Sequence, residues 1–253
     1  MGRFQGRVVA ISGAASGLGR DIAQGLATEG AAKLYLFDVD AKGLADTAGS
    51  IAAPTVQLCC DVADETSVSR AWQQASDIDG LDVLLTAAGT IGAGTPIEAC
   101  SVAEWDRIFN INVRGTFLMV KYALPHLRKN KGNIVTFGSS AGLAGSGTLP
   151  AYSASKGAVA MFTRSLALAH ASDGIRVNSV CPGSIETPML QATFDAAGSP
   201  EAVAARKAEY LKRYPLGRFG AAREVTDAAL FLASDQASYT TGVCLPVDGG
   251  RLA

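Results

Sequence analysis

Short apolar runs alternate with longer segments of helical period along this chain. Each run has the length of one buried strand, and the segments between runs are long enough for helices that return the chain to the same edge of a sheet. The predicted strands are 7–12, 33–37, 56–60, 81–87, 133–137, 176–180 and 243–247, and the first predicted helix is 21–29. This order predicts an α/β fold: a Rossmann-like, doubly wound parallel sheet of about seven strands with helices on both faces.

We expect a single domain over residues 1–253. Hydrophobic residues make up 48% of the chain, which is enough for one large core, and no linker or repeat divides it. One region, roughly 185–215, departs from the alternation and is rich in Ala, Glu and Arg. It follows the sixth strand at the carboxyl edge of the sheet, where open α/β folds bind ligands. We therefore predict that 185–215 is an insertion that forms a mobile lid over a substrate.

Charge and cysteine usage exclude several function classes. A net charge of −1 and a pI of about 6.1 predict no nucleic-acid partner. No apolar run is long enough for a membrane span, and the residues after Met1 lack an apolar signal segment. Five cysteines without repeated spacing and two isolated histidines predict reduced thiols and no metal site. We expect a cytoplasmic protein.

A glycine-rich turn, with Gly13, Gly17 and Gly19, joins the first predicted strand to the first helix. Glycine there allows a tight turn and the close approach of a pyrophosphate, whose charge a helix N-terminus favours. The spacing alone also fits a plain strand-to-helix turn, but Asp38 ends the second strand, where a carboxylate can accept both ribose hydroxyls of NAD. The same carboxylate would repel the 2′-phosphate of NADP, and no Arg or Lys adjoins Gly17 or Asp38. The turn and Asp38 together predict NAD as the cofactor.

Tyr152 and Lys156 are four residues apart and therefore share one face of a predicted helix. A free phenol has a pKa near ~10, and a nearby ammonium lowers that pKa because it favours the phenolate. Such a pair can act as a general acid/base near neutral pH. We therefore expect alcohol oxidation to rise as Tyr152 ionises, with an apparent pKa well below the free value. The same spacing also occurs on solvated helix faces, so further motifs in the chain are needed to choose between a catalytic pair and a solvated face.

The two motifs, Gly-x-x-x-Gly-x-Gly and Tyr-x-x-x-Lys, resemble the signatures of the short-chain dehydrogenase/reductase family. The resemblance covers nearly the whole chain, and the other motifs follow in the family's order. They are Asp61-Val62, Asn112, Ser139 at 13 residues before Tyr152, the segment 182–189 and Asp248-Gly249-Gly250.

Two positions depart from the family pattern. Ser12 stands where the family usually has threonine, and Thr86-Ala87-Ala88-Gly89 stands where it usually has Asn-Asn-Ala-Gly. Because Ala87 has no polar side-chain atom, we expect its contacts to run through the backbone and the local bracing to be weaker.

The resemblance implies an NAD-dependent oxidoreductase that interconverts a secondary alcohol and its ketone. Tyr152 would exchange the proton, Lys156 would lower the pKa of Tyr152 and hold the nicotinamide ribose, and Ser139 would hydrogen-bond the substrate oxygen. Asn112 would hold a water that connects Lys156 to solvent. The implied cofactor-binding residues are Gly13, Ser16, Gly17, Leu18, Gly19, Asp38, Val39, Asp61, Val62, Ala88, Gly89, Tyr152, Lys156, Pro182, Gly183, Ile185 and Thr187.

Other function classes fit parts of the sequence. Gly138-Ser139-Ser140-Ala141-Gly142 matches the nucleophile elbow of a hydrolase, but no Asp or Glu lies between Ser140 and His170, the only later histidine. A non-catalytic dinucleotide sensor would be expected to lose the Tyr, Lys or Ser, and all three are present. A 3-oxoacyl-carrier-protein-type reductase would need a docking surface, for which the basic run 128–131 is a candidate; that run also fits a solvated helix end.

The predicted substrate pocket is bounded by 90–96, by 140–149 and by the region of Met189, Leu190 and Phe194. The first two stretches contain no charged residue, which predicts a neutral small-molecule alcohol or ketone as substrate.

The helix that starts at Tyr152 carries more apolar surface than one sheet face can cover. Its apolar residues are Ala154, Ala158, Ala160, Met161, Phe162, Leu166 and Leu168. An uncovered stripe of that size predicts a homo-oligomer, most simply a tetramer, paired through this helix and the preceding one.

Overall fold

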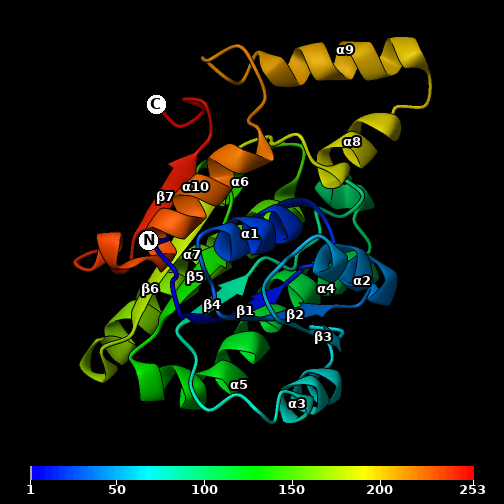
Figure 1. Cartoon of the computed structure of the whole chain (residues 1–253). Helices are drawn as coiled ribbons and strands as arrows, with labels where there is room; N and C mark the ends of the chain where they lie inside the picture. Colours follow the sequence, from blue (N-terminus) through cyan, green and yellow to red (C-terminus); the bar gives the residue numbers. More distant parts are fainter. Residues whose placement is uncertain (1) are drawn as a thin grey trace.

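Seven parallel strands form one sheet in the order β3-β2-β1-β4-β5-β6-β7 (Figure 1). The structure, a computed structural model, describes residues 2–253. The strands are β1 (Val8–Ser12), β2 (Lys33–Asp38), β3 (Thr55–Cys59), β4 (Val83–Thr86), β5 (Asn133–Phe137), β6 (Arg176–Pro182) and β7 (Cys244–Val247). The strand order reverses between β1 and β4, which is the switch point of a doubly wound sheet. The predicted fold class is confirmed.

Most strand bounds agree with the sequence prediction within one or two residues, and the largest differences have local causes. β4 is shorter than the predicted 81–87, because its ladder with β1 runs only from Val83 to Thr86. β6 continues beyond the predicted 176–180, because Cys181 and Pro182 pair with β7.

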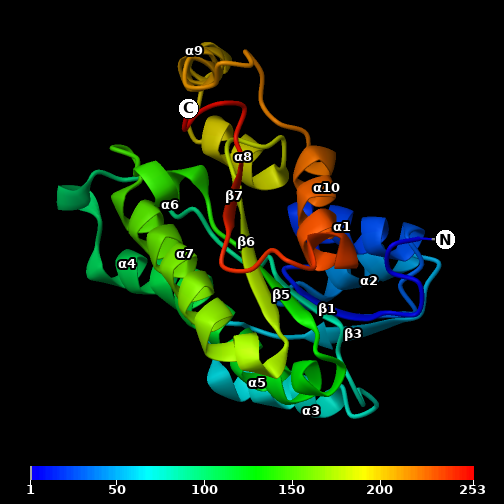
Figure 2. The same cartoon turned by 90° about the vertical axis from the view of Figure 1, so that its left-hand side faces the viewer.

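Helices cover both faces of the sheet (Figure 2). On one face lie α1 (Gly17–Thr28), α2 (Ala41–Gly49) and α10 (Ala222–Ala233); on the other lie α3 (Glu65–Gln74), α4 (Val102–Phe109), α5 (Gly115–Asn130) and α7 (Pro150–His170). Side chains alternate between the two cores along β1, where Val9 and Ile11 face α1 and Ala10 faces the other layer. α1 begins four residues before the predicted 21–29, because the chain turns helical directly after Ser16, whose backbone is extended.

The remaining helices lie beyond the carboxyl edge of the strands. α6 (Ser140–Ala144) follows β5, whereas α8 (Pro188–Asp195) and α9 (Pro200–Leu211) fill the predicted insertion. α8 buries Leu190 and Phe194, but α9 buries none of its residues and lies farthest from the sheet (Figures 1 and 2). Within residues 2–253, no helix is long and apolar enough to cross a membrane.

The apolar surface of α7 is smaller than predicted. Ala160 and Leu166 are buried in the core, because their side of the helix packs against the sheet. Met161 and Leu168 remain exposed at 58% and 83%, and Phe117 on α5 is exposed at 45%. These three are the large apolar side chains that α5 and α7 leave exposed.

Candidate active site

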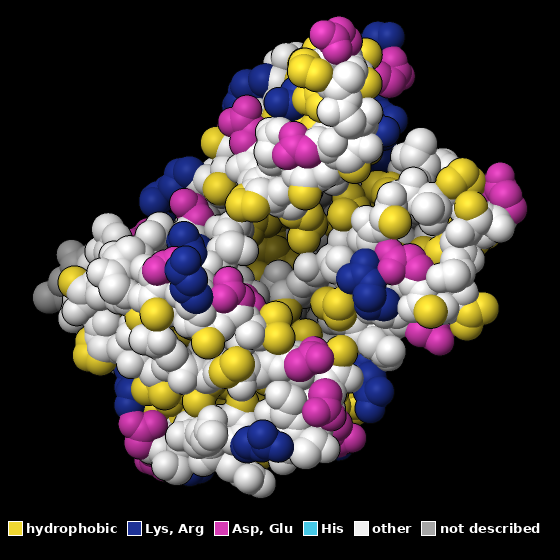
Figure 3. All heavy atoms as spheres, turned by 90° about the vertical axis from the view of Figure 1, so that its right-hand side faces the viewer, with side chains coloured by type: hydrophobic (Ala, Val, Ile, Leu, Met, Phe, Trp, Pro, Cys, Tyr) yellow, Lys and Arg dark blue, Asp and Glu magenta, His cyan; other side chains and the backbone are white. Residues whose placement is uncertain are grey.

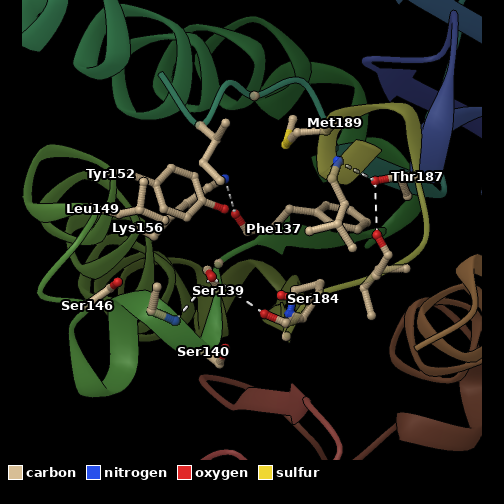
Figure 4. A pocket seen from close by; sticks show the side chains of 18 of the residues that line it. Phe137, Ser139, Ser140, Ser146, Leu149, Tyr152, Lys156, Ser184, Thr187 and Met189 are labelled. Atoms are coloured by element: carbon tan, nitrogen blue, oxygen red, sulfur yellow. Dashed lines mark hydrogen bonds between the residues drawn. The ribbon is translucent and has the colours of Figure 1, made fainter. Parts of the chain in front are cut away.

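Tyr152 and Lys156 project from the first two turns of α7 toward the carboxyl end of β5 (Figure 4). The ammonium of Lys156 donates a hydrogen bond to the carbonyl oxygen of Phe137, the last residue of β5, at 2.8 Å. Its Nζ lies 5.9 Å from the centre of the Tyr152 ring. The predicted spacing on one helix face therefore does bring phenol and ammonium together, and Lys156 keeps two N–H donors beyond the one that Phe137 uses.

The pKa of Tyr152 does not move in the predicted direction. Burial raises the pKa of Tyr152, because it disfavours the phenolate, and the neighbouring Ser139 hydroxyl opposes that rise. Lys156 is not among the groups that shift the Tyr152 pKa, since its ammonium is directed at a backbone carbonyl. Burial also lowers the pKa of Lys156 to about 8. The expectation that the nearby Lys156 ammonium lowers the Tyr152 pKa is therefore not met in the protein without ligands.

Asn112 lies in a π-helical turn, Asn110–Arg114, between α4 and α5. Its Oδ1 accepts from the Thr90 amide at 2.8 Å, and its Nδ2 donates to the Thr90 carbonyl at 2.9 Å and to Ser155 Oγ at 3.0 Å. The side chain is fully buried, so these bonds satisfy an amide that water does not reach. Asn112 thus joins the loop after β4 to α7, next to Lys156. Its predicted role of holding a water stays a prediction.

Ser139 begins α6 at the carboxyl end of β5. Its Oγ accepts from the Ala141 amide at 3.1 Å and donates to the Pro182 carbonyl at 3.5 Å. α6 packs so closely on α7 that a Cβ on Gly142 would lie 2.5 Å from the Lys156 carbonyl carbon. This packing fixes Ser139 beside Tyr152, the arrangement drawn in Figure 4.

Two adjoining cavities open at the carboxyl edge, and every predicted cofactor residue lines one or both of them. The first, the nucleotide cavity, is lined by Gly13, Ser16, Gly17, Leu18, Gly19, Asp38, Val39, Asp61, Val62, Ala88, Gly89 and Thr187, together with Cys60, Ala87, Ile111, Pro188 and Met189. The second, the substrate cavity, holds Tyr152, Lys156, Pro182, Gly183 and Ile185. On the face in Figure 3 the molecule is hollowed at its centre, with hydrophobic side chains in the hollow below the projecting α9 end.

The glycine turn fits a pyrophosphate. Gly13 has a φ of 75°, and a Cβ there would lie 2.5 Å from the Ala88 amide nitrogen; a Cβ on Gly19 would lie 2.0 Å from the Gly13 oxygen. Within residues 2–253, no side-chain bond from Ser16 caps α1, so the first amides of the helix stay free for an anion.

Asp38 lies at the opposite side of the nucleotide cavity from the catalytic groups. Its carboxylate accepts from the amides of Ala15 at 2.9 Å and Asp40 at 3.1 Å. Both bonds fix its orientation and leave lone pairs for a ribose. The free lone pairs are acceptors to which ribose hydroxyls could donate.

At the departures from the family pattern, the hydrogen bond of Ala87 runs through the backbone, as predicted. Ala87 donates its amide to the Ser12 carbonyl at 3.1 Å, and the Ala88 amide lies 3.5 Å from Ser12 Oγ. The neighbouring Thr86 hydroxyl is buried, and within the described chain it has no partner.

The walls of the substrate cavity differ from the prediction in two ways. Phe194 does not line the cavity, because its ring is buried against Tyr210 and Phe219. Arg213 and Arg251 do line it, so the cavity carries charged residues that lie outside the uncharged stretches 90–96 and 140–149. Local sequence pattern could not reveal either arginine: Arg213 lies near the end of the predicted lid and Arg251 follows the Asp248-Gly249-Gly250 signature, and only the fold brings both to the cavity that Tyr152 lines.

The hydrolase elbow has no triad. Ser140 Oγ accepts a hydrogen bond from Arg251 Nη1 at 2.6 Å. His170 is the last residue of α7, at the end remote from the cavity, and its Nδ1 bonds Asp173 at 2.9 Å. Ser140 therefore lacks a base.

Comparisons with known proteins agree with this site. The family model described as enoyl-(acyl carrier protein) reductase matches residues 13–251. The chain is 41% identical over 260 residues to 2-(S)-hydroxypropyl-CoM dehydrogenase 3 of Xanthobacter autotrophicus, covering 99% of this chain and 98% of that protein. It is 39% identical over 255 residues to cis-4-hydroxycyclohexanecarboxylate dehydrogenase of Sinomonas cyclohexanicum, covering 99% and 98%. The crystal structure of levodione reductase superposes with a TM-score of 0.93 at 34% identity and covers 98% of each chain.

Fold, site and relatives define an oxidoreductase that acts on alcohols or ketones. The chain belongs to the short-chain dehydrogenase/reductase family, whose dehydrogenases use NAD or NADP.

Proposed function

We propose that this protein is an NAD-dependent dehydrogenase that interconverts a secondary alcohol and its ketone, with Tyr152 as the general acid/base. The observation that carries the proposal is the meeting of Tyr152, Ser139 and Lys156 in the substrate cavity, which shares wall residues with the nucleotide cavity. A sensor would not need a phenol, a hydroxyl and an ammonium in one cavity. When bound, NAD supplies the hydride acceptor.

Each residue has a role that its contacts support. The Tyr152 hydroxyl takes the proton of the alcohol during oxidation and returns it during reduction. Ser139 donates to the substrate oxygen, since its present bond to Pro182 is long at 3.5 Å and easily exchanged. Lys156 directs its two remaining donors at the nicotinamide ribose. Asn112 keeps the loop after β4 and α7 in register with them.

A screen of structurally diverse secondary alcohols with NAD, read by nicotinamide absorbance, tests the proposal. We expect turnover of at least one alcohol class, with NAD binding retained in Tyr152→Phe but weakened in Lys156→Ala. Stabilisation of the protein by NAD without turnover of any alcohol or ketone would favour a sensor instead.

The proposed preference for NAD over NADP rests on Asp38. At ~4 Å and a surface-like dielectric, a phosphate charge beside this carboxylate costs about 4 kcal/mol before screening, and a third of that is about tenfold in affinity. We expect kcat/KM to favour NAD by at least about tenfold, and Asp38→Ala combined with Val39→Arg to narrow or reverse the preference. Asp46→Ala, which removes an exposed carboxylate of α2, is the matched control. Equal use of both cofactors by the unmodified enzyme would contradict the assignment.

The basic run at the end of α5 does not favour a carrier-protein partner. Arg128 pairs with Asp173 at 3.0 Å and Lys129 with Asp79 at 2.8 Å. The run lies just before β5, at the amino edge of the sheet, whereas the cavities open at the carboxyl edge. Its charges are those of a solvated helix end.

We further propose a cytoplasmic homotetramer. All five cysteines are free thiols, as in a reducing compartment. The exposed Phe117, Met161 and Leu168 supply an apolar surface for pairing α5 and α7 with a second copy. A monomeric mass at micromolar concentration would contradict the oligomer.

A further inference from the structure

The substrate cavity carries positive charge and no negative charge. Its lining includes Lys156, Arg213 and Arg251, and within the described residues no Asp or Glu lines it. The rest of the wall is largely apolar, with side chains such as Ile91, Leu149 and Leu190. A cation in apolar surroundings interacts more strongly with an anion than it would in water, because the effective dielectric constant is lower. The wall is therefore built to favour a ligand with negative charge.

Arg213 is the cation with donors to spare. Its guanidinium stacks over the Tyr210 ring at 4.4 Å, which holds the planar group in place without consuming an N–H. Within residues 2–253 its side chain makes no hydrogen bond or ion pair. Neighbouring cations on the same segment do: Lys212 pairs with Glu209 at 2.9 Å, and Arg218 pairs with Glu224 at 2.7 Å.

Tyr214 fixes the position of Arg213 relative to the cavity. Its hydroxyl donates to Ser184 Oγ at 2.6 Å and accepts from the Ser184 amide at 2.9 Å. Ser184 follows β6, so the residue next to Arg213 is tied to the rigid edge of the sheet even though α9 is not.

Arg251 is the second cation and is already partly engaged. It donates to Ser140 Oγ at 2.6 Å and to the Gly145 carbonyl at 3.0 Å. These bonds hold its charge at the wall and leave fewer donors for a ligand than Arg213 has.

We infer that the substrate is an anionic secondary alcohol, a hydroxy acid whose carboxylate is bound by the Arg213 guanidinium while its carbinol lies at Tyr152 and Ser139. The inference rests on the proposed function and names the substrate class of the same site. The carboxylate takes no part in the reaction: hydride leaves the carbinol carbon for NAD, the hydroxyl proton goes to Tyr152, and a keto acid is formed. Arg251, in the segment after β7, adds positive charge to the wall of the same cavity. This replaces the neutral substrate expected from the sequences of 90–96 and 140–149.

Matched pairs of keto acids and their primary amides test the inference. The series comprises 4-oxopentanoate to 7-oxooctanoate and 4-oxocyclohexanecarboxylate, each with its amide and the corresponding unsubstituted ketone, reduced with NADH. We expect at least one acid to exceed its amide in kcat/KM by about tenfold, the size expected for a charge-assisted pair. Arg213→Gln should reduce the acid-to-amide ratio by about tenfold through KM, and Arg213→Lys should restore part of it. Lys212→Gln removes the same charge one residue away and should leave the ratio unchanged.

A second measurement needs no variant. In the unmodified enzyme, kcat/KM for the acid should fall with rising ionic strength, whereas kcat/KM for the amide should not. Amides or neutral ketones that react as well as the acids, or better, would overturn the anion site. A rise in the KM of the Arg213→Gln variant for NADH, measured with the keto amides as substrates, would assign the arginine to the cofactor instead. Failure of acids, amides and neutral ketones alike would overturn the proposed function itself, which separates the two failures.

Discussion

The two sides of the substrate cavity are built in different ways. On the sheet side, Asn112, Ser139 and Lys156 are buried and each is held by hydrogen bonds to the backbone. On the lid side, α9 buries none of its residues, and its few side-chain bonds include Arg206 to the Thr193 carbonyl at 2.9 Å. Positions of the catalytic atoms thus depend on the core, whereas the substrate wall depends on a weakly packed segment. The difference suggests that substitutions in the weakly packed segment can change the substrate without changing the type of reaction.

The largest expected effect is the loss of the phenol on the sheet side. Tyr152→Phe removes one oxygen and should reduce kcat by at least about 100-fold, within the range of general acid/base catalysis, while NAD still binds. Tyr239→Phe alters a fully exposed tyrosine and should retain full activity. Retention of more than about a tenth of kcat, a barrier change below ~1.4 kcal/mol, would show that Tyr152 is not the acid/base.

The next effect concerns stability. Asn112→Ala leaves the amide and carbonyl of half-buried Thr90 without side-chain partners, and it removes the fully buried Asn112 amide; it should cost about 1–3 kcal/mol in the free energy of unfolding. Gln191→Ala removes the lid bond to Asp195 at 2.6 Å and should cost less than about 0.5 kcal/mol, because both groups are exposed. Urea unfolding of both variants measures the contrast. Equal losses in the free energy of unfolding for the two variants would mean that the sheet side and the lid side of the cavity are equally well fixed.

The third prediction uses the pKa of about 8 that burial gives Lys156. Burial favours the neutral amine, so the ammonium is present below that pH and is lost as the pH rises through it. Because ketone reduction uses the charged form, its kcat/KM should be constant at neutral pH and fall above about pH 8. A profile of NADH-dependent reduction that stays flat to strongly alkaline pH would show that the charge of Lys156 is not required.

The smallest expected effect is a difference in amide hydrogen exchange between α9 and α7. Amide hydrogens of α9 should exchange faster than those of α7 in the free protein, and NAD with substrate should slow exchange in α9 more than in α7. Mass spectrometry of deuterium uptake resolves the two helices. Exchange in 185–215 that is unaffected by both ligands would rule out a lid.

The sequence predicted the sheet side of the cavity much better than the lid side. β5 matches the predicted 133–137, and the four predicted catalytic residues come together, because strand runs, the glycine turn and a four-residue helical spacing are local properties. The burial of Phe194 and the position of Arg213 at the cavity were not predicted, because both depend on how α8 and α9 fold back over the sheet. The rise in the Tyr152 pKa depends on burial, and the burial of Ala160 and Leu166 depends on the rotation of α7 against the sheet. None of these can be derived from spacing along the chain.

Thr187 and Met189, at the start of α8, line both cavities. A nucleotide that settles against this turn therefore also shapes the wall that the alcohol meets. We expect compulsory-order kinetics in which the dinucleotide enters first and leaves last, so that substrate recognition is completed only in the binary complex.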